Sequence, residues 1–185
     1  MILSRSGDNS FVLGAVNAAM GIGGIIGGII VSAGKLSKDP VKMIYVSAGI
    51  SFLLGDLMMG VGRNVIMWSF AGLAASFPIA FINAGQNVIL YKKVPEKMQG
   101  RVFAVRNAIQ YSTIPVGILL GGFLADYVFE PFMLKDNAVT RVCHVLVGSK
   151  PGSGMAVMFL CTGLLGSLFS YFSFKCKAVS ELRKG

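Results

Sequence analysis

The sequence predicts an all-α membrane protein in which five helices cross the bilayer. Hydrophobic residues make up 54% of its 185 residues and charged residues only 14%, whereas soluble domains have about 45–50% and 25%. The mean hydropathy is +0.70. The apolar residues also gather in five long runs, and most charged residues lie between these runs. This combination excludes a disordered chain and an ordinary water-soluble domain.

Each apolar run reaches the length of about 20 residues that a membrane helix needs. The second run contains only Asp56 as a charged residue, and the fourth has Arg106 near its start and Asp126 near its end. The predicted spans are 11–34, 43–62, 64–91, 102–128 and 152–174. They form a membrane domain over 11–177, between an external segment 1–10 and a cytoplasmic tail 178–185. The stretch Phe129–Pro151 is expected to be a loop.

Basic residues in the short links indicate the orientation, because they accumulate on the cytoplasmic side. Eleven of them fall in links on one side of the membrane, namely Lys35, Lys38, Lys42, Lys92, Lys93, Lys97, Arg101, Lys175, Lys177, Arg183 and Lys184. Five fall on the other side, namely Arg5, Arg63, Lys135, Arg141 and Lys150. We therefore expect a multi-pass plasma-membrane protein whose C-terminus is cytoplasmic.

Several function classes do not fit the composition. A net charge of +9 would favour nucleic acid in a soluble protein, but here the basic residues are dispersed among separate links. The three cysteines and His144 lack metal-ligand spacing, so no metal or cofactor is expected. The sequence lacks HExxH, GxSxG and any cluster of base and nucleophile, so we do not expect an enzyme.

Polar side chains follow one face of the third span, where Asn83 and Asn87 align and Gln86 lies alongside. Carboxamides inside a membrane are costly unless they face protein or water. They therefore either bond a neighbouring helix or line a polar cavity. Gln110, Tyr111 and Thr113 give the fourth span a similar character. Pro78 and Pro115 lie near the middle of these two spans and permit bends.

Asp56 is the acidic residue that lies well inside a span, roughly 20 Å along its helix from Met43 at 1.5 Å per residue. An ionisable residue at that depth is a candidate functional group and favours a partner. Arg63, seven residues on, is expected to pair with it; proton coupling is the alternative. Arg106 is expected to extend towards the cytoplasm or to pair with Glu96.

Small residues predict how the spans pack, because membrane helices approach closely at Gly, Ala and Ser. In the first span, Asn17, Gly21, Gly24, Gly28 and Ser32 share a face. Gly23 and Gly27 form a second small pair in this span, and Gly117 and Gly121 form one in the fourth. Thr162 and Ser170 lie on a similar face in the fifth. Simple helix packing explains any single pair.

Two adjoining stretches suggest a family: YKKVPEKMQGRVFAVRNA over Tyr91–Ala108 and YSTIPVGILLGGFLADYVFEPFM over Tyr111–Met133. Together they resemble the macrolide-efflux and enterobactin-exporter branch of the major facilitator superfamily. The resemblance extends from Phe11 to about Lys177, and the five spans look like helices 8 to 12 of a twelve-helix transporter. It implies that two six-helix halves enclose a central cavity and rock to open it to either side.

The resemblance also implies roles for particular residues. The substrate-cavity candidates are Asn17, Asn83, Gln86, Asn87, Gln110, Tyr111 and Thr113. Gly100 and Arg101 would belong to a cytoplasmic hinge, and Pro115 would assist the gating motion. The implied partners are the lipid bilayer, the N-terminal helices of the same transporter, a small amphipathic substrate and possible coupling protons. Asp56 is the intramembrane charge of this chain. The alternative is that the acid that couples protons to transport lies in the N-terminal half of the transporter.

The leading functional hypothesis is therefore the C-terminal portion of a secondary active transporter, an efflux pump for amphipathic drugs or siderophore-like compounds. Five helices cannot form the two-lobed cavity, so we do not expect the chain to transport alone. The alternative is a non-transporting membrane scaffold or assembly subunit that binds partner helices through its small-residue faces.

Overall fold

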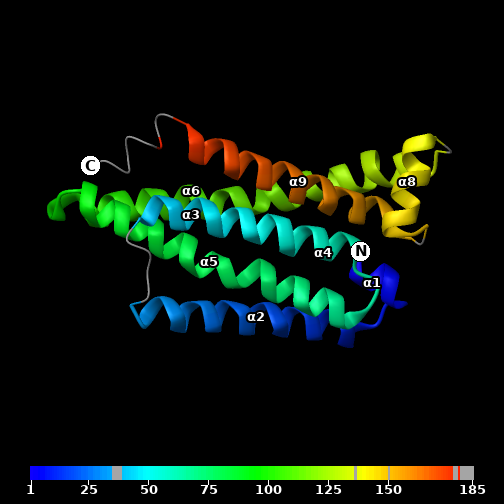
Figure 1. Ribbon diagram of the computed structural model, residues 1–185, viewed down its shortest axis with the longest axis horizontal. Coiled ribbons are helices and arrows are strands. Elements are labelled where there is room, and N and C mark those ends of the chain that lie inside the picture. The colour runs from blue at the N-terminus through cyan, green and yellow to red at the C-terminus, as the bar shows by residue number, and fades with distance from the viewer. Residues whose placement is uncertain (35–38, 136, 150, 177–178, 180–185) are drawn as a thin grey trace.

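The computed structural model describes residues 1–34, 39–135, 137–149, 151–176 and 179, and these residues form helices and no strand. Five helical segments are long and apolar enough to cross a membrane (Figure 1). They are Ser10–Ser32, Pro40–Val61, Val65–Lys93, Glu96–Met133 and Ser153–Lys175. The five long apolar helices predicted from the sequence are therefore present, and the described part of the chain is all-helical, with the helix lengths and composition of a membrane protein.

The helices carry labels in chain order. The first part of the chain comprises α1 (Ile2–Ser6), α2 (Ser10–Ser32), α3 (Pro40–Ile50), the π-helical η1 (Ser51–Asp56), α4 (Leu57–Val61) and α5 (Val65–Lys93). The second part comprises α6 (Glu96–Leu124), the π-helical η2 (Ala125–Phe129), α7 (Glu130–Met133), α8 (Ala138–Val147) and α9 (Ser153–Lys175).

Local signals explain where several helices begin. The Asn9 side chain accepts a hydrogen bond from the Phe11 N–H at the start of α2, at 3.0 Å. Asp39 accepts one from the Lys42 N–H at 2.9 Å, and Pro40 occupies the first turn of α3. These side chains satisfy N–H groups that have no partner within the helix. Short capping residues therefore set these two helix starts.

Helix α5 lies at the centre of a layered packing, with α2 on one side and the α3–η1–α4 segment on the other (Figure 1). Helix α9 then packs on the far side of that segment. Gly23 and Gly27 let α2 approach the α5 backbone: a Cβ at Gly27 would lie 2.5 Å from the Phe77 carbonyl oxygen. The close approach predicted at small residues therefore occurs at this pair. The glycines of the predicted face itself, Gly21, Gly24 and Gly28, have no neighbour within 4 Å of such a Cβ, so these glycines do not pack against a described helix.

Helix α6 packs differently from the rest. It contacts α5 only weakly, and its continuation through η2 and α7 contacts α9. None of its residues from Glu96 to Leu124 is buried. Its side chains therefore stand open along most of its length.

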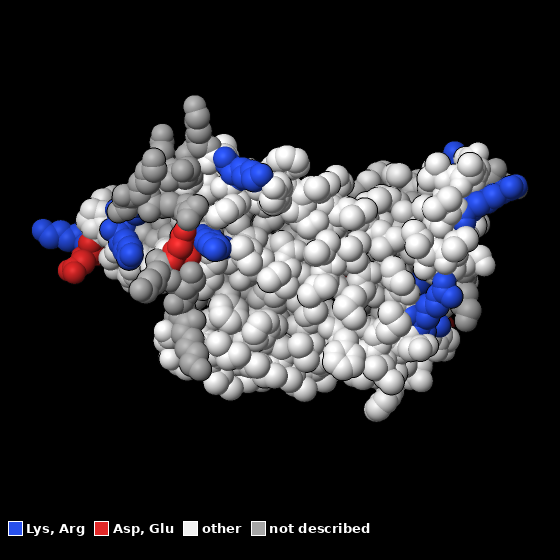
Figure 2. Space-filling model, viewed as in Figure 1, with Lys and Arg blue, Asp and Glu red and all other residues white. Residues whose placement is uncertain are grey.

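The outer surface matches a lipid environment between two charged ends. On α2, Ile22, Ile25 and Ile29 are 52%, 64% and 63% exposed, which suits contact with acyl chains rather than water. On the face drawn in Figure 2, the described charged residues lie at the two ends, and the surface between them is free of charge. The α5–α6 turn lies at one end, and α1 and α8 lie at the other (Figure 1).

The expectation of a loop over Phe129–Pro151 is wrong, because this stretch contains α7 and α8. Asn137 and Thr140 form a capping box that begins α8, and Val139 and Val142 form an exposed apolar face three residues apart. This periodicity is helical. Helix α8 is too short to cross a bilayer.

Of the predicted tail 178–185, only residue 179 lies within the described part of the chain. The basic residues Lys35, Lys38, Lys150, Lys177, Arg183 and Lys184 also lie outside it.

Candidate functional site

A cavity of about 520 Å³ opens among the helices at the α1 end of the bundle. Its lining residues come from α1, α2, η1–α4, α5, α6–η2 and α9, so the cavity lies where most of the described helices meet. Its lining residues are Met1, Ile2, Leu3, Leu13, Val16, Asn17, Met20, Gly55, Asp56, Met59, Ala75, Gly121, Gly122, Ala125, Met155, Met158 and Phe159.

Two polar side chains line this largely apolar space, Asn17 from α2 and Asp56 from η1. The Thr162 hydroxyl of α9 donates to Asp56 Oδ2 at 3.0 Å, and its alternative acceptor is the Phe159 carbonyl at 3.1 Å. One hydroxyl proton serves one acceptor at a time. The Asp56 carboxylate is half-buried, and no Lys or Arg in the described part of the chain forms an ion pair with it.

The expected pair between Asp56 and Arg63 is absent, because α4 ends at Val61 and Arg63 does not continue the helical face of Asp56. The Arg63 guanidinium instead donates to the Val145 carbonyl at 3.1 Å. Arg5 donates to the Val147 carbonyl at 2.8 Å. The two arginines thus bind the last carbonyls of α8, where the helix dipole favours a cation. Burial and the nearby Arg63 charge lower the pKa of Arg5 from its ordinary value.

Both π-helical segments border the cavity. Gly55 and Asp56 end η1, and Ala125 begins η2. A π-helical turn inserts an extra residue into a helix, and such turns are frequent at functional sites. The cavity therefore lies between two local departures from α-helical geometry.

The walls of the cavity are rich in methionine, with Met20, Met59, Met155 and Met158 on three different helical segments. Methionine side chains are flexible and polarizable, so they adapt to occupants of different shape. Trp68, the single tryptophan of the chain, is 2% exposed and packs with Val16 and Met59 behind one wall.

A second polar cluster lies between α5 and α6, towards the other end of the bundle. The Arg106 guanidinium donates to Asn87 Oδ1 at 2.8 Å and also to Gln86 Oε1. A groove of about 440 Å³ beside it is lined by Gln86, Ile89, Leu90, Arg106, Ile109 and Gln110. Arg106 therefore pairs with carboxamides rather than with Glu96.

The structure divides the predicted substrate-cavity residues between these two places. Asn17 joins Asp56 in the cavity, whereas Gln86, Asn87 and Gln110 belong to the α5–α6 cluster. Asn83 is half-buried on α5 and lines neither space.

The remaining predicted positions lie on α6. Tyr111 is 66% exposed, and the Thr113 hydroxyl donates to the Gln110 carbonyl at 2.7 Å. Gly100, Arg101 and Pro115 are also exposed on this helix.

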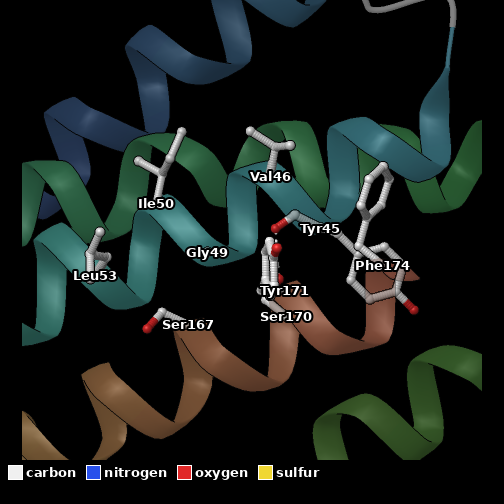
Figure 3. A pocket seen from close by; sticks show the side chains of 9 residues that line it. All are labelled: Tyr45, Val46, Gly49, Ile50, Leu53, Ser167, Ser170, Tyr171 and Phe174. Atoms are coloured by element: carbon white, nitrogen blue, oxygen red, sulfur yellow. Dashed lines mark hydrogen bonds between the residues drawn. The ribbon is translucent and has the colours of Figure 1, made fainter. Parts of the chain in front are cut away.

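A third space, a groove of about 270 Å³ between α3–η1 and α9, differs from both (Figure 3). Its lining includes neither a charged nor a carboxamide side chain. The Ser170 hydroxyl turns towards α3 and donates to the Tyr45 carbonyl at 2.7 Å, so it serves the helix–helix contact (Figure 3). This groove offers little to orient a polar ligand.

Sequence reasoning missed two functional contacts. It places Thr162 on a small-residue packing face, and the contact of this residue with Asp56 arises only when α9 lies against η1. Glu130 accepts from the Gly152 and Gly154 N–H groups at 2.9 and 2.8 Å and so caps α9. In the sequence, the only signal for this cap was a carboxylate ahead of an apolar helix. Glu130 lies 22 residues before Gly152, which is too far for the usual capping pattern to reveal the contact.

Comparison with protein families, with curated proteins and with solved structures finds no match for this chain. The fold and the site thus define its class, an all-helical protein with five membrane-length helices and polar groups among them.

Proposed function

We propose that this chain forms part of a secondary active transporter, resembling the macrolide-efflux and enterobactin-exporter branch of the major facilitator superfamily. The observation that carries the proposal is the open polar face of α6. This helix is long enough to cross a membrane and buries no residue from Glu96 to Leu124. It nevertheless exposes Gln110, Tyr111 and Thr113 and draws Arg106 into hydrogen bonds with α5.

Lipid chains cannot form hydrogen bonds with the polar side chains on the exposed face of α6. This face therefore requires water or further helices beside it. A second helical lobe across a water-filled pathway supplies both. Polar faces on two adjacent helices, each containing a proline, suit a lobe that rocks against such a partner. The flexible Met-rich cavity walls suit a small amphipathic substrate.

The same proposal covers location and energy source. The greater number of basic residues at the α5–α6 end favours the cytoplasmic side of a plasma membrane for that end. Protons are the proposed coupling ion, and Asp56 is the proposed acid because it lies well inside the Pro40–Val61 span.

A second candidate function is a scaffold that binds partner helices. Open glycine pairs favour it, since a Cβ added at Gly24 or Gly28 on α2, or at Gly117 or Gly121 on α6, would meet nothing within 4 Å. Such pairs are typical of membrane helix interfaces. They leave Arg106 and its carboxamide partners unexplained.

Thiol accessibility separates the two functions. Single cysteines replace Asn87, Gln110 and Thr113 in the gene at its native locus, in a background whose Cys143, Cys161 and Cys176 are replaced by alanine. We expect a charged, membrane-impermeant methanethiosulfonate to label these positions, because a transport pathway contains water. Ile25→Cys, on the outer face of α2, is the lipid-facing control and should remain unlabelled. Protection of all three test positions would contradict the transporter and favour the scaffold.

A further inference from the structure

The cavity at the α1 end contains a carboxylate without a charged partner among the described residues. Asp56 lies within the Pro40–Val61 span, and the Thr162 hydroxyl supplies its hydrogen bond. A neutral hydroxyl does not compensate a negative charge, and a partly desolvated charge is costly without compensation. The cavity therefore has an electrostatic preference for a cation.

The described positive groups near the cavity do not meet this need. The Met1 amino group lies at the cavity and donates to Met155 Sδ at 3.1 Å rather than to Asp56. The Arg5 and Arg63 guanidinium groups bind the carbonyls at the end of α8. An occupant with a positive charge would therefore supply the compensation that these groups do not.

The lining identifies the kind of cation. A hard metal ion such as Ca²⁺ takes 6–8 oxygen ligands, and the described residues hold no cluster of three or more potential metal-binding side chains. The cavity instead offers one carboxylate, the Asn17 carboxamide and a large apolar surface. Phe159 presents an aromatic ring and the methionines present polarizable sulfur, and both attract organic cations.

Space for an apolar body is available on the α6 side. Gly121 and Gly122 line the cavity without side chains, and a Cβ added at either would have no neighbour within 4 Å. The volume of about 520 Å³ lies within the range of small-molecule sites.

We propose that this cavity binds an amphipathic organic cation whose positive centre lies against Asp56 and whose apolar body lies against the methionine wall. Asn17 orients the polar end from the opposite helix. The site lies eleven residues along α6 from Gln110, roughly 16 Å at 1.5 Å per residue. The thiol test positions Asn87, Gln110 and Thr113 lie outside this cavity, so thiol labelling there and cation binding here can fail independently. The proposal rests on the proposed function, because the same methionine walls and Asp56 are assigned there to the substrate and the coupling proton.

Two ions of the same shape and opposite charge test the proposal. The full chain in lipid nanodiscs is titrated with tetraphenylphosphonium and with tetraphenylborate, and binding is measured by equilibrium dialysis and by Trp68 fluorescence. We expect saturable binding of the cation and none of the anion. Because Trp68 packs against the lining residues Val16 and Met59, occupancy should change its emission.

Three variants locate the charge and the space. Asp56→Asn keeps a hydrogen-bond acceptor for Thr162 and should weaken cation binding at least tenfold, whereas Asp56→Glu should retain it within about threefold. Gly121→Leu should also weaken binding, because its side chain enters the cavity. The matched control Glu96→Gln removes an exposed carboxylate at the α5–α6 end and should change nothing.

The proposal is overturned if tetraphenylphosphonium binding to the unmodified chain does not saturate, because unsaturable uptake is the result of partition into lipid only. Equal affinity in Asp56→Asn and the unmodified chain also overturns it. Labelled thiols on α6 combined with absent cation binding would leave the transporter standing without this site. Cation binding combined with protected thiols would leave the site without the transporter.

Discussion

Helices α5 and α6 are alike in length and in having an internal proline, and they are opposite in packing. Each has 29 residues and one internal proline, Pro78 or Pro115. Helix α5 buries Trp68, Ala71, Gly72, Ser76, Pro78 and Gly85, whereas α6 buries none. Apolar length therefore governs whether a helix can cross a membrane, and it does not determine which neighbours the helix acquires.

Glycine shows the difference most clearly. A Cβ at Gly72 of α5 would lie 2.8 Å from the Met20 side chain, and one at Gly85 would lie 2.7 Å from Ile44. On α6, Gly100, Gly117 and Gly121 have nothing within 4 Å. The same residue type thus permits close packing on one helix and leaves open surface on the other.

The largest expected effect comes from filling the packed side. Gly27→Leu places a side chain against the Phe77 carbonyl of α5, and backbone atoms cannot yield as a flexible side chain can. We expect a loss of about 3 kcal/mol, the upper end of overpacking costs. Unfolding by sodium dodecyl sulfate, followed by Trp68 fluorescence, measures it.

Gly28→Leu is the matched control for this change, because the adjacent glycine faces open space. Its stability should remain within about 0.5 kcal/mol of the unmodified chain. Equal destabilisation by both variants would show that the α2–α5 contact is misplaced.

A smaller effect is expected at the junction that holds α9. Glu130→Ala removes the acceptor for two N–H groups at the start of α9, and losing a helix cap costs about 1 kcal/mol. The same unfolding measurement applies. Asp126→Ala removes an exposed carboxylate four residues earlier and should have no measurable effect; a larger loss there than at Glu130 would contradict the capping role.

The smallest effect is expected on the open side. Gly117→Leu on α6 should change the stability of the chain by less than about 0.5 kcal/mol, because no described residue lies near it. A substantial loss in purified chain would mean that α6 packs on the bundle. Comparison with Gly27→Leu in the same assay contrasts the close α2–α5 contact with the open surface of α6.

The sequence was sufficient for the five long helices, and it was insufficient for the short helices α7 and α8 and for the packing partners of each helix. Run lengths located five long helices, because crossing a bilayer imposes a minimum apolar length. They did not reveal the π-helical η1 and η2, which shift the register of the residues after them. Face assignments that assume 3.6 residues per turn lose accuracy beyond such a shift.

The candidate site shows the same limit. The depth of Asp56 was readable from the sequence, but its contact with Thr162 spans 106 residues and depends on how α9 docks. Arg106 was expected to extend towards the cytoplasm or to pair with Glu96, yet carboxamides of α5 accept its hydrogen bonds. The sequence identified the polar residues within the apolar runs, while their grouping into two separate places required the fold.

The continuous helical segment Glu96–Met133 has 38 residues, about 57 Å at 1.5 Å per residue. The hydrocarbon layer is only about 30 Å thick, so roughly a third to a half of this helical segment would extend beyond it at tilts of about 40° to 0°. Where α5 and α6 meet, Lys92, Lys93, Lys97 and Arg101 are exposed, and basic side chains at a helix end favour the lipid headgroups over the hydrocarbon layer. We expect this turn to limit how deep the bundle sits in a bilayer.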